Sequence, residues 1–166
     1  MSIKKVVLSF LLIGTFYAGS AQILLTENFS YGTVTDSLTN PANGGLKWKR
    51  HSGSFNAIQY LPSSLTYIGY PASATGGSVS FVNGSGSRED ANIAISPAVT
   101  NGSMYAAFIL KVTASGGTTG DYNVHLLDGA GASPGSNFRV RLFIKDGSVA
   151  STFKVGISKG SFRFST

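Results

Sequence analysis

Short runs of β-branched and aromatic residues recur along the whole chain, and residues that favour turns separate them. Glycine is frequent, at 21 of 166 residues, while charged residues make up only 12% of the chain. Glycine and β-branched residues both lower helix propensity, and no stretch shows the sustained periodicity of an amphipathic helix. Strands at this spacing, with Gly, Asn and Pro between them, are typical of a β-sandwich or a β-barrel. The sequence therefore predicts an all-β domain.

The densest strand signal lies in the second half of the chain. Residues 105–112 form an almost continuous apolar run between Asn101–Ser103 and Ala114–Thr118, which predicts a strand buried on both faces at the middle of a sheet. Asp146-Gly147 predicts a compact hairpin between two further strands. The expected strands are residues 23–31, 46–50, 55–60, 65–70, 78–82, 91–96, 105–112, 121–127, 138–145 and 152–158.

The first 21 residues have the layout of a secretory signal peptide. Two lysines precede an apolar stretch over residues 6–17, and small residues at positions 18–21 offer a cleavage site. The apolar stretch is too short to span a bilayer comfortably, and nothing after it predicts a transmembrane segment. We therefore expect a secreted or cell-surface protein whose mature part, residues 22–166, forms one β-sandwich domain without a membrane span.

The net charge bears on which partners the protein can bind, and the cysteine content bears on how its fold is stabilised. The formal net charge is +6, and two of these charges lie in the signal peptide, which leaves +4 for the mature part. The cations are dispersed instead of forming a run, so they indicate solubility, and a sheet face that carries several of them and attracts acidic glycans or nucleic acid is the alternative. No nucleic-acid partner is expected. Cysteine is absent, so an exported product relies on core packing and sheet hydrogen bonds.

A set of segments spread from Thr26 to Lys159 follows one family pattern. The segments are Thr26–Gly32, Trp48 with His51–Gly53, Leu65–Tyr70, Val82–Gly86 with Glu89–Asp90, Met104–Phe108, Gly120–Tyr122, Arg139–Arg141 and Gly156–Lys159. Together they resemble the amino-terminal domain of many secreted multidomain proteins of Bacteroidetes and related flavobacteria. The resemblance implies a concanavalin A-like jelly roll, an antiparallel sandwich of two sheets. It also implies further modules and a carboxyl-terminal signal for type IX secretion downstream.

Two shorter features add to this resemblance. Asp36-Ser37-Leu38 resembles the acceptor motif for protein O-glycosylation in these bacteria, and an ordinary loop is the alternative interpretation. Residues 162–166 alternate between apolar and polar side chains like the start of another strand. We therefore expect the sandwich to be incomplete at its carboxyl end and downstream domains of the same polypeptide to follow.

The carboxylates do not form the pattern that glycoside hydrolysis requires. That reaction needs two carboxyl groups facing each other across the substrate, and jelly-roll glycosidases place acids at alternate positions of one strand. Glu89 and Asp90 are adjacent instead, so in an extended chain they point to opposite faces. We expect this domain not to be an enzyme. An accessory role in a larger secreted hydrolase or nuclease, with its catalytic domain beyond residue 166, and a purely structural spacer remain the alternatives.

Calcium is the only metal ion for which the sequence offers candidate ligands. His51 and His125 are the only histidines, and neither has another ligand at transition-metal spacing. Calcium accepts carboxylates and carbonyls from irregular loops, so Glu27, Asp121 and Asp128 are candidate calcium ligands. The alternative is that they are solvated acids at strand ends. We expect no other cofactor.

Aromatic and arginine side chains suggest a sugar-binding surface. Flat rings stack on pyranose rings, and polar side chains take the hydroxyl groups. Two arginines alternate with apolar residues and are expected to share the polar face of their strand, where they could clasp an acidic glycan. The candidate ligand-binding residues are Trp48, Tyr67, Tyr70, Tyr122, Arg139 and Arg141. Core packing is the alternative for the aromatics, and a noncatalytic module that binds a polysaccharide or surface glycan, or serves in adhesion, is the leading hypothesis.

Overall fold

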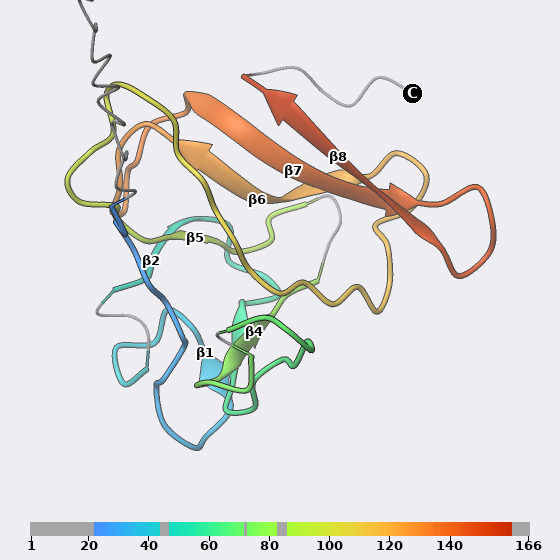
Figure 1. Ribbon diagram of the computed structural model, residues 1–166, viewed down its shortest axis with the longest axis horizontal. Coiled ribbons are helices and arrows are strands. Elements are labelled where there is room, and N and C mark those ends of the chain that lie inside the picture. The colour runs from blue at the N-terminus through green and yellow to red at the C-terminus, as the bar shows by residue number, and fades with distance from the viewer. Residues whose placement is uncertain (1–21, 44–46, 72, 83–85, 161–166) are drawn as a thin grey trace, which may run out of the picture.

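The computed structural model describes residues 22–43, 47–71, 73–82 and 86–160. All regular structure in these ranges is β, arranged in three small antiparallel sheets (Figure 1), so the all-β prediction is confirmed. The predicted signal peptide and the alternating residues 162–166 lie outside the described residues. Within the described ranges, no helix is long and apolar enough to cross a membrane.

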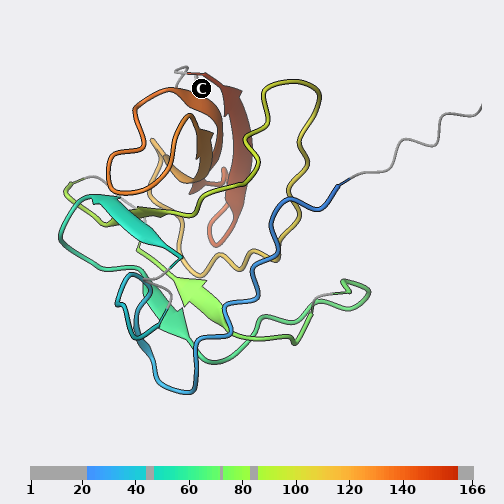
Figure 2. The same cartoon turned by 90° about the vertical axis from the view of Figure 1, so that its left-hand side faces the viewer.

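The strands are short in the first half of the chain and longer in the second. They are β1 (Asp36–Ser37), β2 (Lys49–Ser52), β3 (Gln59–Leu61), β4 (Ser78–Ser80), β5 (Asp90–Asn92), β6 (Asp121–Leu127), β7 (Phe138–Asp146) and β8 (Phe153–Lys159). The strand orders are β1-β3-β4, β2-β5 and β6-β7-β8. Figure 2 shows the last sheet in one half of the molecule and the two smaller sheets in the other.

The β6-β7-β8 sheet forms where the sequence alternates most regularly. β6 has the predicted bounds, and β7 and β8 lie within one residue of theirs. β7 is the central strand, and Arg141 on it pairs with His125 of β6 and Ser158 of β8. Phe143 and Ile144 are buried on opposite faces of β7, as consecutive strand residues must be. The sheet with the longest strands is therefore the one in which each strand pairs with the next strand along the chain.

A second, smaller core lies beneath the β1-β3-β4 sheet. Tyr60 and Leu38 are each only 1% exposed, and the Tyr60 hydroxyl donates a hydrogen bond to the Gly32 carbonyl at 2.6 Å. A Cβ atom on Gly77 would lie 2.5 Å from the Tyr60 ring, closer than any packed side chain allows. Gly77 therefore lets the backbone before β4 approach the buried ring.

The predicted central strand at 105–112 is wrong. Its backbone has no strand assignment, and Tyr105 is 89% exposed. A strand needs a partner on at least one edge, and no ladder between described residues includes this segment. The apolar run fits the composition of a strand, but it contains no information about which other strand could pair with its edge.

Two other predicted strands are replaced by local structure. Near 23–31, the Glu27 carboxylate accepts a hydrogen bond from the Phe29 amide at 2.6 Å, and Phe29 has a positive φ of 51°. At 65–70, Tyr67 and Tyr70 are joined by a backbone hydrogen bond of 3.1 Å across Gly69, whose φ is 85°. A positive φ at the third residue of a turn favours glycine, so this segment folds back instead of extending. β2 to β5 fall within or beside their predicted segments but are shorter or shifted.

Candidate functional site

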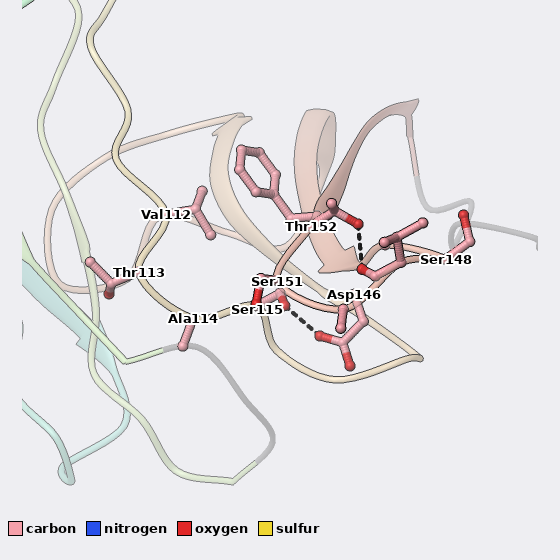
Figure 3. Close-up of a pocket in the computed structure, with 12 residues that line it drawn as sticks. Val112, Thr113, Ala114, Ser115, Asp146, Ser148, Ser151 and Thr152 are labelled. Carbon is pink, nitrogen blue, oxygen red and sulfur yellow. Dashed lines mark hydrogen bonds between the residues drawn. The ribbon is translucent and has the colours of Figure 1, made fainter.

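An open pocket of about 410 Å³ lies at the hairpin end of β7 and β8. Two segments that are distant in the sequence form it, namely residues 112–115 and residues 146–153 (Figure 3). The predicted hairpin at Asp146-Gly147 is present there, although its loop continues to Thr152 before β8 begins. Two of the lining residues, Asp146 and Phe153, form the last pair of the β7–β8 ladder, and the others belong to loops.

Hydrogen bonds within the hairpin loop shape one wall of the pocket. The Gly147 amide donates to the Thr152 carbonyl at 2.8 Å, and the Thr152 hydroxyl donates to the Val149 carbonyl at 2.6 Å. A Cβ atom on Gly147 would lie 1.9 Å from the Thr152 hydroxyl oxygen, so glycine is required for this closure. Ser151 adopts a left-handed conformation with φ of 62°, which turns the chain back toward β8. The loop is thus a defined turn.

The second wall is joined to the first through Asp146. The Ser115 hydroxyl donates to the Asp146 carboxylate, as the dashed line in Figure 3 shows. The Asp146 amide donates to the Gly117 carbonyl at 3.0 Å. These two bonds join the segment around residues 112–117 to the end of β7. Asp146 therefore joins the two walls of the pocket.

The pocket offers the groups that recognise hydroxyl-rich ligands. It has one carboxylate, Asp146, and Phe153 contributes an aromatic ring that is 46% exposed. No cationic side chain is found among the described residues that line it. The hydroxyl groups come from Thr113, Ser115, Ser148, Ser151 and Thr152. Hydroxyl and carboxylate oxygens exchange hydrogen bonds with sugar hydroxyls, and an exposed ring can stack on a sugar face.

Trp48 lies in an aromatic cluster instead of on an open binding surface. Its ring stacks on Phe29, with centroids 5.9 Å apart and an interplanar angle of 23°. Tyr31 contacts Phe29 edge-on at 6.4 Å, and it contacts Tyr60 at 5.6 Å. The geometry of Trp48 therefore agrees with the alternative of core packing.

Tyr67 and Tyr70 are placed together at the turn that replaces the predicted strand 65–70. Tyr67 is 70% exposed, and its amide donates a hydrogen bond to the Ser73 hydroxyl oxygen at 2.8 Å. Figure 2 shows the segment between β3 and β4 extending away from the rest of the molecule. Neither of these two tyrosines lines the pocket.

The expected pair of arginines is not formed. Arg139 is exposed, and its Nε atom donates to the Asp128 carboxylate at 2.8 Å. Arg141 is buried, and its guanidinium carbon lies 5.5 Å from the centre of the Tyr122 ring. Because a register shift falls between Leu126 and Leu127 on the paired strand, the two arginines do not share a face. Tyr122 and Arg141 are brought together, but in the interior.

The three candidate calcium ligands lie in different places. Glu27 accepts hydrogen bonds from the Phe29 amide and the Tyr31 hydroxyl, each at 2.6 Å. Asp121 accepts from the amide of its neighbour at 2.8 Å. The hydrogen bond from Arg139 lowers the pKa of Asp128, so this carboxylate is held in its charged form. No group of three or more His, Cys, Asp or Glu that could hold a metal is found among the described residues.

The Asp36-Ser37-Leu38 motif is part of the fold. Ser37 lies in β1 opposite Gln59 and is half-buried, with its hydroxyl oxygen 3.2 Å from that of Thr39. Leu38 is fully buried. This geometry agrees with the alternative interpretation, in which the three residues are an ordinary structural segment.

None of the candidate ligand-binding or calcium-binding residues predicted from the sequence lines the pocket. Asp146 and Gly147 were predicted only as a hairpin turn, and Thr152 was predicted to begin the next strand. A hydroxyl-rich turn directly after an acid at a strand end is a signal that could have drawn attention to it. The contribution of residues 112–115 could not be found this way, since Val112 was predicted to end a central strand and Ala114 to begin the turn after it.

Comparison of the chain with protein-family models, with curated proteins and with solved structures gave no match.

Proposed function

We propose that this chain is a noncatalytic, exported module that binds a polysaccharide or surface glycan in the pocket at the β7–β8 hairpin. The observation that carries the proposal is the lining of that pocket, which combines the Asp146 carboxylate, several hydroxyl groups and the exposed Phe153 ring. Sugar-binding sites use such polar groups for orientation and a ring for stacking. The signal-peptide pattern of residues 1–21 supports export.

The charge of the pocket favours a neutral glycan. A carboxylate without a cation among the described lining residues repels acidic sugars, whereas it accepts hydrogen bonds from neutral sugar hydroxyls. The arginines that could have bound an acidic glycan are occupied, since Arg139 pairs with Asp128 and Arg141 lies among aromatic rings. We therefore propose neutral polysaccharide as the ligand class.

We also propose that the three sheets belong to a concanavalin A-like jelly roll. Support comes from the antiparallel pairing of every strand pair in the described ladders and from the spacing of strand signals along the chain. Such a fold suits a binding module, because its loops gather at the ends of a rigid scaffold. The pocket lies at one such end, where a strand ladder gives way to a loop.

Two matched substitutions test the binding site. Asp146→Asn removes the pocket carboxylate, while Asp128→Asn removes an exposed carboxylate that does not line the pocket. Purified wild type and variants are tested for retention on cellulose, xylan and dextran as neutral probes and on alginate as an acidic one. We expect wild type and D128N to bind a neutral probe, and D146N to bind it about tenfold more weakly or worse, because a charge-assisted hydrogen bond is lost.

The outcomes separate the site from the function. Equal binding by D146N and D128N, with both folded by circular dichroism, would move the glycan site away from the pocket. Absence of binding by the wild type to all four polysaccharides and on a glycan array would overturn the binding function, and a structural spacer would then be the better account.

A further inference from the structure

A long stretch of the chain is uncharged, and the same stretch exposes several large apolar side chains. Residues 52–87 contain no Asp, Glu, Lys, Arg or His, whereas charged residues make up 12% of the whole chain. Burial of this stretch against an apolar partner would therefore take no charged group of its own out of water. The exposed apolar side chains in it include Phe55, Tyr67, Ile68, Phe81 and Val82.

The most exposed part of this stretch is the turn Tyr67–Tyr70, which we call the tyrosine turn. Ile68 is 100% exposed and Tyr67 is 70% exposed, while Tyr70 is half-buried. A Cβ atom added to Gly69 would meet nothing within 4 Å. The turn lies in the segment between β3 and β4 that extends away from the rest of the molecule (Figure 2). Ile68 is therefore the apolar side chain that a surface approaching this segment meets.

Hydrogen bonds within the segment hold the tyrosine turn in shape. The Tyr70 amide donates to the Tyr67 carbonyl at 3.1 Å, and the Tyr67 amide donates to the Ser73 hydroxyl oxygen at 2.8 Å. The Ser73 amide donates to the Tyr70 carbonyl at 3.0 Å, and the Ala74 amide donates to the Leu65 carbonyl at 3.2 Å. These backbone groups are therefore paired without water, as the interior of a lipid bilayer requires.

The chemistry of the tyrosine turn matches the interface of a lipid bilayer. An isoleucine side chain offers no hydrogen bond to a sugar, whereas its transfer from water to acyl chains is favourable. Tyrosine is amphipathic and is enriched at the level of the lipid headgroups. The amides of Ile68 and Gly69 have no hydrogen bond to another described residue, and interfacial water and headgroup oxygens accept such bonds at that depth. The turn therefore suits shallow insertion.

We propose that the tyrosine turn anchors the protein to a lipid bilayer, with Ile68 among the acyl chains and the two tyrosines at the level of the headgroups. None of these residues lines the pocket, so this role goes beyond glycan binding. The anchor is apolar, because the whole of residues 52–87 is uncharged. It therefore differs from the attraction of dispersed cations to anionic lipid.

Sedimentation with vesicles tests the anchor. The purified protein is mixed with vesicles of phosphatidylcholine, which have no net charge, at low and at high salt. We expect binding that salt does not weaken, because the turn makes no ion pairs. Ile68→Ser should weaken binding about tenfold or more, since the inserted side chain is lost. Val34→Ser is the matched control and should bind like wild type, because Val34 is 69% exposed and lies outside residues 52–87.

Three results of this experiment would overturn the proposal. The first is no binding of the wild type to phosphatidylcholine vesicles. The second is equal binding by the Ile68→Ser and Val34→Ser variants. The third is binding that requires added phosphatidylglycerol and disappears at high salt, since that pattern belongs to dispersed cations.

A fluorescent label at position 68 measures insertion directly. The chain has no cysteine, so Ile68→Cys and Val34→Cys each supply a single thiol for an environment-sensitive fluorophore. Vesicles should shift the emission of the label at position 68 to shorter wavelength and leave the label at position 34 unchanged. Equal shifts at both positions would show adsorption without an anchor and would overturn the proposal.

Polysaccharide retention separates the anchor from a sugar-binding surface. Ile68→Ser should be retained on the neutral polysaccharides as wild type is, because Ile68 does not line the pocket. A loss of retention together with unchanged vesicle binding would assign the tyrosine turn to glycan and overturn the membrane anchor.

Discussion

Arg141 and Phe138 lie on the same face of β7, with the guanidinium carbon 4.8 Å from the ring centre. Residues three apart in a regular strand point to opposite faces. The register shift opposite Leu126 and Leu127 inserts Arg139 as an extra residue, and this brings Phe138 back to the Arg141 side. The bulge therefore separates the two arginines that the sequence pattern places together.

The first prediction compares these two arginines. Arg141→Ala should lower the free energy of unfolding by about 2–4 kcal/mol, because a buried side chain loses its packing and its contacts with aromatic rings. Arg139→Ala should leave the unfolding midpoint unchanged, since this side chain is exposed and its ion pair is solvated. Urea denaturation followed by tryptophan fluorescence measures both. Equal losses would show that the bulge does not divide the two positions.

Local sequence patterns predicted some strands of this fold correctly and failed for others. β6, β7 and β8 were predicted within one residue because a hairpin pairs neighbouring segments, so alternation and turn chemistry contain nearly all the information. The segment 105–112 has as strong an apolar signal, but its pairing depends on a distant edge. A short stretch of sequence does not determine which distant segment it pairs with, and this is why that prediction is wrong.

The candidate site was less predictable than the fold, for a related reason. Arg139 and Arg141 were expected on one face because strand alternation was assumed to be unbroken, and a single bulge overturns that inference. Asp146 meets Ser115 from a segment that is distant in the sequence, and no local pattern shows this contact. Local chemistry identifies which side chains can bind, whereas tertiary contacts decide which of them meet.

The second prediction concerns two glycines with similar backbone conformations. Gly53 has a φ of 67° and Gly160 a φ of 70°. Gly160→Ala should cost about 1–2 kcal/mol from the left-handed conformation alone, because an added Cβ atom meets nothing within 4 Å. Gly53→Ala should cost about 1–3 kcal/mol more, since its Cβ atom would lie 1.6 Å from the Arg88 carbonyl oxygen. Thermal and urea unfolding measure the difference, and equal costs would contradict the close approach of Gly53 to Arg88.

The third prediction uses the ionisation of Tyr31. Burial raises the pKa of the Tyr31 hydroxyl, and the Glu27 carboxylate, which accepts its hydrogen bond at 2.6 Å, raises it further. A raised pKa in the folded state means that the unfolded chain loses its proton first. The stabilisation is therefore complete below about pH 10 and is lost as the pH rises above it. Wild type should lose stability steeply at alkaline pH, and Tyr31→Phe should lose less.

The control for this prediction is Tyr105→Phe, since Tyr105 is 89% exposed. Its substitution should leave the alkaline decline of the wild type unchanged. Unfolding midpoints are measured from about pH 8 to pH 11, on both sides of the ordinary tyrosine pKa. A Tyr31→Phe variant that declines as steeply as wild type would show that Tyr31 does not couple its ionisation to folding.

The last prediction follows from the position of β8 at the edge of the β6-β7-β8 sheet among the described strands. β8 is the final strand in the order of this sheet, and the side chains of Phe153, Val155 and Ile157 on one of its faces are exposed by 46%, 49% and 73%. An exposed apolar edge strand pairs readily with another chain. The purified protein should therefore associate with increasing concentration, as sedimentation velocity can measure. Ile157→Lys should suppress association, because a charge on an edge strand opposes pairing, while Ile68→Lys, at a fully exposed turn position, should not. Association that responds equally to both substitutions would show that general surface hydrophobicity, and not the β8 edge, brings the molecules together.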